Sequence, residues 1–94
     1  MIKTVQVLIT GKVQGVCFRA YTLEKAIELN LNGWVRNNPD GTVEAIFQGQ
    51  DQEIQQMLDW CKQGPSLAIV DDLKVEDISN KLLTKRFEDF YIQY

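Results

Sequence analysis

The sequence has 94 residues, of which 45% are hydrophobic and 24% charged, a composition expected of one globular domain. It contains no histidine and two cysteines, which argues against a disulfide framework, a histidine-dependent nucleophile and a zinc site. The net charge of −3 is uneven, because residues 1–37 carry five cations and two anions, and residues 38–94 carry five cations and eleven anions. The first part suits a small anion, whereas the acidic remainder argues against wrapping a nucleic acid backbone.

The N-terminal run, MIKTVQVLIT, alternates between polar and apolar residues and lacks the apolar block of a signal peptide. No other stretch is apolar for long enough to cross a bilayer. We therefore expect no membrane association and a cytoplasmic location. The same alternation predicts a first strand over residues 4–10, with Val5, Val7 and Ile9 on one face.

A loop over residues 11–17, GKVQGVC, is predicted to join this strand to a helix over residues 18–29. The spacing of three apolar residues predicts one buried face for the helix: Leu23, Ala26 and Ile27. The helix is expected to end near Asn30, because asparagine tolerates a left-handed backbone there. Leu31 would then pack behind that end of the helix.

A β-hairpin is predicted next. A short strand over residues 34–37 leads into NPDG, residues 38–41, in which proline and glycine suit the second and fourth positions of a turn. Val43, Ala45 and Phe47 alternate along the returning strand, so the two strands should pair.

The second predicted helix follows this hairpin. Asp51 is expected to cap it, and Gly64 with Pro65 to end it. One apolar stripe has the i, i+3, i+4, i+7 spacing of a helix: Ile54, Met57, Leu58 and Cys61. Beyond this helix we expect a strand over residues 70–78, a loop or short helical turn over 79–86, and an edge strand over 87–94.

The order of these elements is β-α-β-β-α-β with one strand added at the end. It predicts an α+β fold of the ferredoxin-like type, a sandwich in which two helices cover one face of a mostly antiparallel sheet. In this topology the first two strands run parallel with another strand between them. The loop over residues 11–19 should therefore lie close to Asn37.

The 11–19 loop, GKVQGVCFR, admits three interpretations. It is either a seat for an anion, built from glycine backbone, a helix N-terminus and Arg19, or a tight structural turn, and the residues alone do not decide between these two. A reactive thiol at Cys17 is less favoured. Phosphatases that attack with cysteine place an arginine about five residues after it, whereas Arg19 follows Cys17 by two.

This loop resembles a signature of the acylphosphatase family, glycine-x-valine-glutamine-glycine-valine-x-phenylalanine-arginine, without a mismatch. A second family pattern is similar to GWVRNNPDGTVEAIFQG, residues 33–49, and the stretch GPSLAIV, residues 64–70, is also similar to the family's sequence. The departures are Asn30, where glycine is frequent, and Gln93, where arginine is usual. The resemblance spans nearly the whole chain and implies a ferredoxin-like fold.

The resemblance further implies hydrolysis of acyl phosphates to a carboxylate and inorganic phosphate. The implied phosphate cradle consists of Gly15, Val16, Cys17, Phe18 and Arg19. Arg19 would be the essential side-chain ligand of the phosphate, and Asn37 would orient the attacking water. No cofactor and no metal are expected, since no cluster of acidic ligands accompanies the loop.

Two other functions compete with this one. An acylphosphatase-like module that only binds acyl or carbamoyl phosphate for another domain is less favoured, because no partner domain follows in the sequence. An RNA-recognition module shares the element order, but the strand TVEAIFQG lacks its aromatic and basic signature and the pI is 4.8. We therefore expect a monomer that acts on a small acyl phosphate and binds no nucleic acid, with the acyl group unspecified.

Overall fold

The computed structural model describes residues 2–81 and 85–94 of the chain. Seven elements follow the expected order: β1 (Ile2–Lys12), α1 (Phe18–Glu28), β2 (Asn32–Asn37), β3 (Val43–Gln50), α2 (Asp51–Gln63), β4 (Ile69–Asp77) and β5 (Phe90–Ile92). Within the described residues, no helix is long and apolar enough to cross a membrane.

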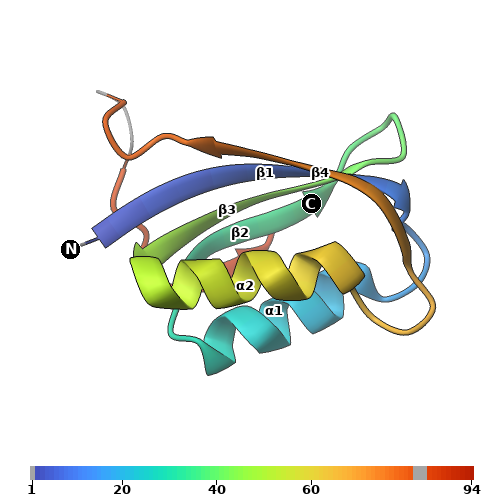
Figure 1. The fold of residues 1–94 in the computed structure, drawn as a ribbon, viewed down its shortest axis with the longest axis horizontal. Helices are drawn as coiled ribbons and strands as arrows, with labels where there is room; N and C mark the ends of the chain where they lie inside the picture. Colours follow the sequence, from blue (N-terminus) through green and yellow to red (C-terminus); the bar gives the residue numbers. More distant parts are fainter. Residues whose placement is uncertain (1, 82–84) are drawn as a thin grey trace.

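The five strands form one sheet in the order β4-β1-β3-β2-β5. Its neighbouring strands are antiparallel, except for β2 and β5, which are parallel. Both helices pack against the same face of the sheet, and among residues 2–81 and 85–94 no helix covers the opposite face (Figure 1). The predicted α+β, ferredoxin-like sandwich is therefore confirmed.

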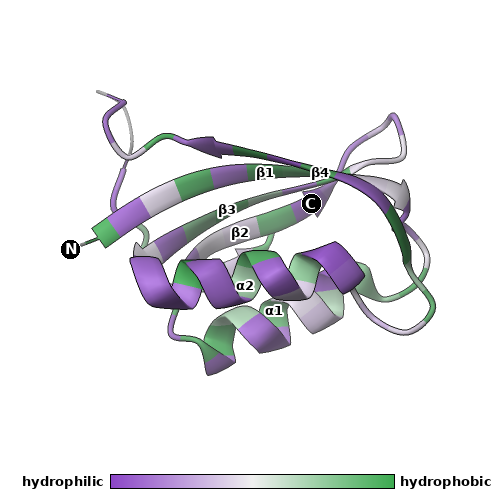
Figure 2. Cartoon of the chain, in the orientation of Figure 1, coloured by the Kyte–Doolittle hydropathy of each residue, from purple (hydrophilic) through white to green (hydrophobic). Residues whose placement is uncertain are grey.

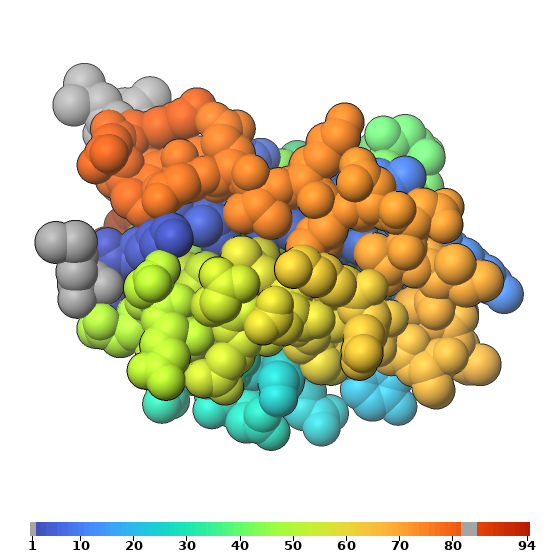
Figure 3. Space-filling model, viewed as in Figure 1, coloured from blue at the N-terminus to red at the C-terminus, as the bar shows by residue number. Residues whose placement is uncertain are grey.

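The strand faces follow the hydropathy alternation, which is visible along β1 in Figure 2. Val5, Val7 and Ile9 are at most 1% exposed, and Val43, Ala45 and Phe47 of β3 repeat the pattern. Complete burial of such a side chain contributes about 1.5–3 kcal/mol, so the alternation fixes which face of each strand meets the helices. In the space-filling view the atoms of α2 lie beside those of β1 (Figure 3).

Helix α1 buries a face that matches the expected one only in part. Ala26 is buried and Leu23 packs against the core, as expected, but Ile27 is 59% exposed, and Phe18 and Thr22 are buried instead. Phe18 sets this rotation, because its ring packs edge-on against Trp60 with a centroid distance of 5.7 Å. Residues four and eight positions after Phe18 must then face inward as well.

The end of α1 matches the prediction, whereas the start of α2 does not. Asn30 has a φ of 58°, and the N–H of Leu31 donates to the carbonyl of Ala26 at 2.9 Å, so the predicted end of α1 is confirmed. Leu31 is buried there, as expected. The prediction that Asp51 caps α2 is wrong. The cap position is Gln50, and Asp51 is the first helical residue and pairs with Lys3 at 2.9 Å.

The segment before β5 is attached to the sheet by the buried side chain of Gln48, which belongs to the central strand β3. The Gln48 amide N–H groups donate to Thr4 and to the carbonyl of Lys85, and its carbonyl accepts from the N–H of Phe87 at 2.8 Å. The edge strand is shorter than predicted, since β5 has three residues. Part of the predicted 79–86 loop, residues 82–84, lies outside the described residues.

Candidate active site

A cavity of about 360 Å³ opens at the edge of the sheet where β1 and β2 end. It is lined by residues of the 13–17 loop, the first turn of α1, the end of β2 and the C-terminal segment: Val13, Gly15, Cys17, Phe18, Arg19, Ala20, Asn37, Ile92 and Tyr94. The expected proximity of the 11–19 loop and Asn37 is thus confirmed. Strand β3 lies between β1 and β2 and is antiparallel to each, so β1 and β2 run parallel. The loop that follows β1 and Asn37 at the end of β2 therefore lie at the same edge of the sheet.

The loop is shorter than predicted, because β1 continues to Lys12. Gly11 belongs to the strand, where the register with β4 shifts and an added Cβ would come within 2.1 Å of the Ile69 carbonyl oxygen. Gly15 differs, since its φ is 75° and no atom would meet a Cβ within 4 Å. Gly11 therefore permits strand pairing, and the left-handed turn of the loop depends on Gly15.

Two side chains anchor the loop in the core. Val16 is 7% exposed and Phe18 is 1% exposed. Cys17, between them, has a left-handed backbone with a φ of 62° and occupies the cap position of α1. With its neighbours held inward, the loop turns its backbone and the Cys17 side chain toward the cavity.

The N-terminus of α1 is suited to an anion. The Cys17 side chain makes no cap hydrogen bond, and the first turn of α1 contains no acidic residue. Backbone N–H groups at a helix start lack intrahelical partners and carry the positive end of the helix dipole. Arg19 adds a full positive charge in the same turn. The electrostatics of this corner therefore favour a negatively charged ligand.

The Arg19 guanidinium lies over the ring of Tyr94, 5.3 Å from its centroid. Arg19 takes part in none of the ion pairs among the described residues. A cation–π contact holds the guanidinium plane and leaves its N–H donors available. Tyr94 had no role in the sequence predictions, because a contact across the sheet edge leaves no local pattern.

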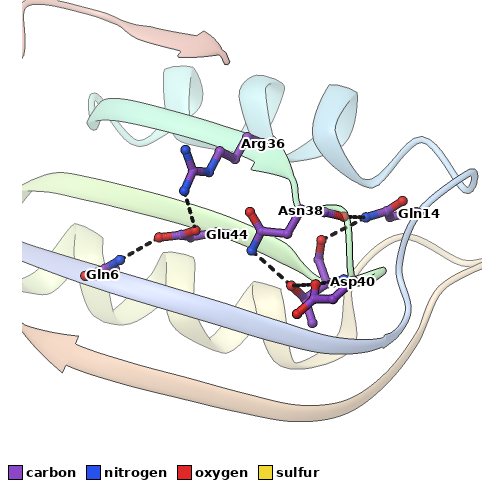
Figure 4. Close-up of polar contacts among 7 residues, drawn as sticks. Gln6, Gln14, Arg36, Asn38, Asp40 and Glu44 are labelled. Atoms are coloured by element: carbon purple, nitrogen blue, oxygen red, sulfur yellow. Dashed lines mark hydrogen bonds and ion pairs between the residues drawn. The ribbon is translucent and has the colours of Figure 1, made fainter. Parts of the chain in front are cut away.

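Asn37 is the last residue of β2, pairs with Val43 of β3 and is half-buried at the cavity wall. The adjoining turn is held by other side chains. Asn38 donates from its side-chain amide to the Thr42 hydroxyl, and Asp40 accepts from the Thr42 N–H and hydroxyl (Figure 4). Asn38, the first residue of the NPDG turn, therefore holds the hairpin turn, and Asn37 lines the cavity.

One further residue at this corner was missed from the sequence. The side-chain amide of Gln14 donates to the carbonyl oxygens of Asn38 at 2.8 Å and Thr42 at 2.9 Å (Figure 4). These two bonds connect the loop to the hairpin turn beside Asn37. Gln14 is part of the recognised loop motif, but the motif does not tell which partner its side chain meets.

The two thiols occupy different environments. Cys61 is 0% exposed, and burial raises the pKa of its thiol to about 12, so it is protonated at neutral pH. Cys17 is exposed and lines the cavity. The chain has no histidine to activate it. Within the described part of the chain, no group of three or more cysteine, aspartate or glutamate side chains is placed to hold a metal ion.

A second hollow, of about 400 Å³, lies on the open face of the sheet and is lined in part by Glu44, Lys74 and Glu76. Burial works against ionisation of Glu44, but hydrogen bonds from Gln6 and Arg36 and the Arg36 charge outweigh it and lower the carboxyl pKa. Glu44 is therefore an anion at neutral pH. Two carboxylates make this hollow unsuitable for phosphate, although it is slightly larger than the first cavity.

The fold and the first cavity define a small ferredoxin-like domain with a cationic corner built from a glycine loop and a helix start. The sequence model of the acylphosphatase family matches residues 5–92, and the chain belongs to that family. The predicted enzyme class, an acylphosphatase, is thereby confirmed.

Individual relatives agree with this assignment. An acylphosphatase of Syntrophus aciditrophicus is 50% identical over 94 residues, which cover 100% of this chain and 95% of the relative. The crystal structure of an acylphosphatase from Bacillus subtilis superposes with a TM-score of 0.90 and 30% identity over 100% of both chains. Full-length HypF in its phosphate- and nucleotide-bound form matches with a TM-score of 0.89 and 32% identity, and this chain covers 12% of it.

Proposed function

We propose that the protein hydrolyses the carboxyl–phosphate bond of acyl phosphates in the cavity at the start of α1. The observation that carries this proposal is the meeting, in one cavity, of an acid-free helix N-terminus, Arg19 and Asn37. These groups supply positive charge for a phosphoryl group and a polar amide for a water molecule. Family membership supports the same reaction.

The phosphoryl group binds to residues 15–19. The backbone N–H groups of Gly15, Val16, Cys17 and Phe18 surround its oxygens, and the planar guanidinium of Arg19 takes two of them. Phosphoryl transfer concentrates negative charge on these oxygens in the transition state. Donors already fixed around them therefore stabilise the transition state without having to rearrange.

Asn37 holds the attacking water in line with the bond that breaks. An amide can orient water but cannot deprotonate it, so the proton passes to a phosphoryl oxygen as the new P–O bond forms. The bond between phosphorus and the acyl oxygen breaks, and its electron pair leaves on the carboxylate. The products are a carboxylate and dihydrogen phosphate, which carries both protons of the water, and the chain needs no histidine for either step.

The leaving group explains why so few side chains suffice. The carboxylate of an acyl phosphate is the conjugate base of an acid with a pKa of about 4, so it departs at neutral pH without a general acid. The charge that a metal ion would supply comes here from Arg19 and the helix start. We propose that the reaction is independent of metal ions.

A direct test measures phosphate release from acetyl phosphate, with and without EDTA. Turnover should be unchanged by the chelator. Loss of turnover on chelation, restored by added Mg²⁺ or Zn²⁺, would contradict a metal-independent reaction. Tight binding of acetyl phosphate without any turnover would replace hydrolysis by a binding function.

The role of Asn37 is tested by Asn37→Ala. Turnover should fall by about 10²-fold, as on loss of one positioned polar group, while the competitive inhibition constant of inorganic phosphate should stay nearly constant. Circular dichroism should remain native, because the side chain is not in the core. Full turnover in the folded variant would move the search for the water's partner to Asn38 or the loop backbone.

A further inference from the structure

The side chain of Gln14 bridges two segments that the backbone does not connect. Its amide nitrogen donates to the carbonyl oxygens of Asn38 and Thr42 at 2.8 and 2.9 Å. Both partners are acceptors, so only the NH₂ end of a carboxamide fits this position. Among the described residues, no other hydrogen bond joins the 13–17 loop to the 37–42 segment.

The anchoring point lies next to Asn37. Asn38 follows Asn37 directly, and the N–H of Asn38 donates to the Thr42 carbonyl at 2.9 Å, closing the base of the turn. The next pair along the hairpin is Asn37 with Val43. Gln14 therefore contacts both arms of the hairpin, at Asn38 and Thr42 (Figure 4). These two residues directly adjoin the pair of Asn37 and Val43.

The proposed phosphate cradle and the proposed water holder stand on different parts of the chain. The cradle, residues 15–19, is one continuous segment. Asn37 belongs to β2, which is separated from β1 by β3 in the sheet. Among the described residues no ladder of backbone hydrogen bonds joins the loop directly to the end of β2. The distance from cradle to water therefore depends on the core packing of Val16 and Phe18 and on the Gln14 bridge.

We propose that Gln14 is a positioning residue for the hydrolysis, acting by fixing the phosphate cradle relative to Asn37. This inference rests on the proposed function. Gln14 touches neither phosphate nor water in this role. In-line attack is sensitive to placement, and a displacement of about 1 Å costs roughly 10²-fold in rate. Loss of the bridge should therefore slow turnover while leaving the cradle itself intact.

The first test replaces Gln14 by methionine, which keeps the length and removes the donor. Turnover of acetyl phosphate should fall about 10-fold or more, while the inhibition constant of inorganic phosphate changes by less than about twofold, since the cradle lies within one segment. A merely structural role would lower the thermal midpoint and leave turnover per folded molecule unchanged. An equal loss in phosphate binding would mean that Gln14 builds the cradle, and either result overturns the proposal.

Two further variants secure this test. Gln14→Leu also removes the donor without adding a charge and should show the same kinetic split, so the proposal is still tested if the methionine variant does not fold. Gln6→Met is the matched control. Gln6 is also part-buried and donates its side-chain amide to Glu44, but it lies outside the site cavity and should keep normal kinetics.

The decisive experiment is a double-mutant cycle between Gln14→Met and Asn37→Ala. If Gln14 acts through Asn37, the double variant is no slower than Asn37→Ala alone. Multiplicative losses would show that Gln14 acts elsewhere and overturn the inference with the proposed function intact. If Asn37→Ala alone kept full turnover, the proposed role of Asn37 would fail and this inference with it.

Discussion

The two helices of this protein begin in opposite ways. Neither start has a side-chain cap hydrogen bond, but helix α1 starts at a left-handed Cys17, has no acid in its first turn and presents Arg19. Helix α2 starts at an extended Gln50 and has Asp51 and Glu53 in its first turn. Asp51 also pairs with Lys3 at 2.9 Å.

The difference lies in what neutralises each helix dipole. In α2 the chain's own carboxylates face the positive end, which stabilises the helix by about 0.3–1 kcal/mol for each acid. In α1 that stabilisation is absent and the positive end faces a cavity. A helix N-terminus is therefore not a phosphate site by itself, and the side chains of its first turn decide whether an external anion can use it.

The largest effect should come from Arg19→Ala, which removes the charge that most distinguishes α1. A charged hydrogen bond contributes about 1.5–3 kcal/mol to binding, and loss of a donor to the transition state lowers turnover by about 10²–10³-fold. We expect kcat/KM for acetyl phosphate to fall by at least that factor. Steady-state kinetics measure this change. A fall of less than about tenfold would contradict the proposal that Arg19 is the main side-chain ligand of the phosphoryl group.

A smaller effect should follow when α1 is made to resemble α2. Ala20 is the third helical residue of α1 and Glu53 is the third of α2. Ala20→Glu should raise the free energy of unfolding by about 0.3–1 kcal/mol and weaken inhibition by phosphate about tenfold, as expected for a like charge worth roughly 1.4 kcal/mol.

Ala20→Gln is the control for the size of the new side chain, because Ala20 lines the cavity. It should weaken phosphate inhibition far less than Ala20→Glu. Equal effects of the two variants would show that bulk, and not charge, blocks the site.

The converse change in α2 should leave catalysis untouched. Glu53→Gln removes an acid from the first turn of that helix, at a site remote from the cavity. Denaturant unfolding should show a loss of about 0.3–1 kcal/mol, and phosphate inhibition should not change. A new effect of phosphate on the stability of this variant would indicate that any exposed helix start binds the ion.

The smallest kinetic effect is expected for the cavity thiol. Cys17→Ser should retain turnover within about twofold, since the proposed role of this residue uses its backbone and small side-chain changes at exposed sites perturb stability little. Complete inactivation in a folded variant, or a trapped phosphocysteine detected by mass spectrometry, would instead favour nucleophilic attack by the thiol.

The sequence predicted those features that depend on local periodicity or on a long motif. Alternation identified β1 and β3, the spacing from Ile54 to Cys61 identified the buried face of α2, and the topology brought the 11–19 loop to Asn37. The inward face of α1 was not predictable from apolar residues alone. Phe18 fixes the rotation of that helix through a contact with Trp60, and polar Thr22 is buried while Ile27 is exposed.

The remaining features that the sequence did not predict involve contacts between segments far apart in the chain. Gln14 reaches the hairpin turn, and Tyr94 covers Arg19 at 5.3 Å, through side-chain directions that only the folded chain specifies. The cap of α2 was misplaced by one residue, and the ion pair of Asp51 with Lys3 of β1 is not visible in the local sequence either. Local patterns thus identified the elements, whereas the connections between them required the structure.

The central claim is that the start of α1, and not that of α2, binds phosphate. The most direct measurement is a titration of the ¹⁵N-labelled protein with inorganic phosphate, followed through backbone amide resonances. We predict saturable shifts at residues 15–19 that are strongly weakened by Arg19→Ala, with no saturable shifts at residues 51–53. Comparable shifts at both helix starts, or none at residues 15–19, would contradict the account.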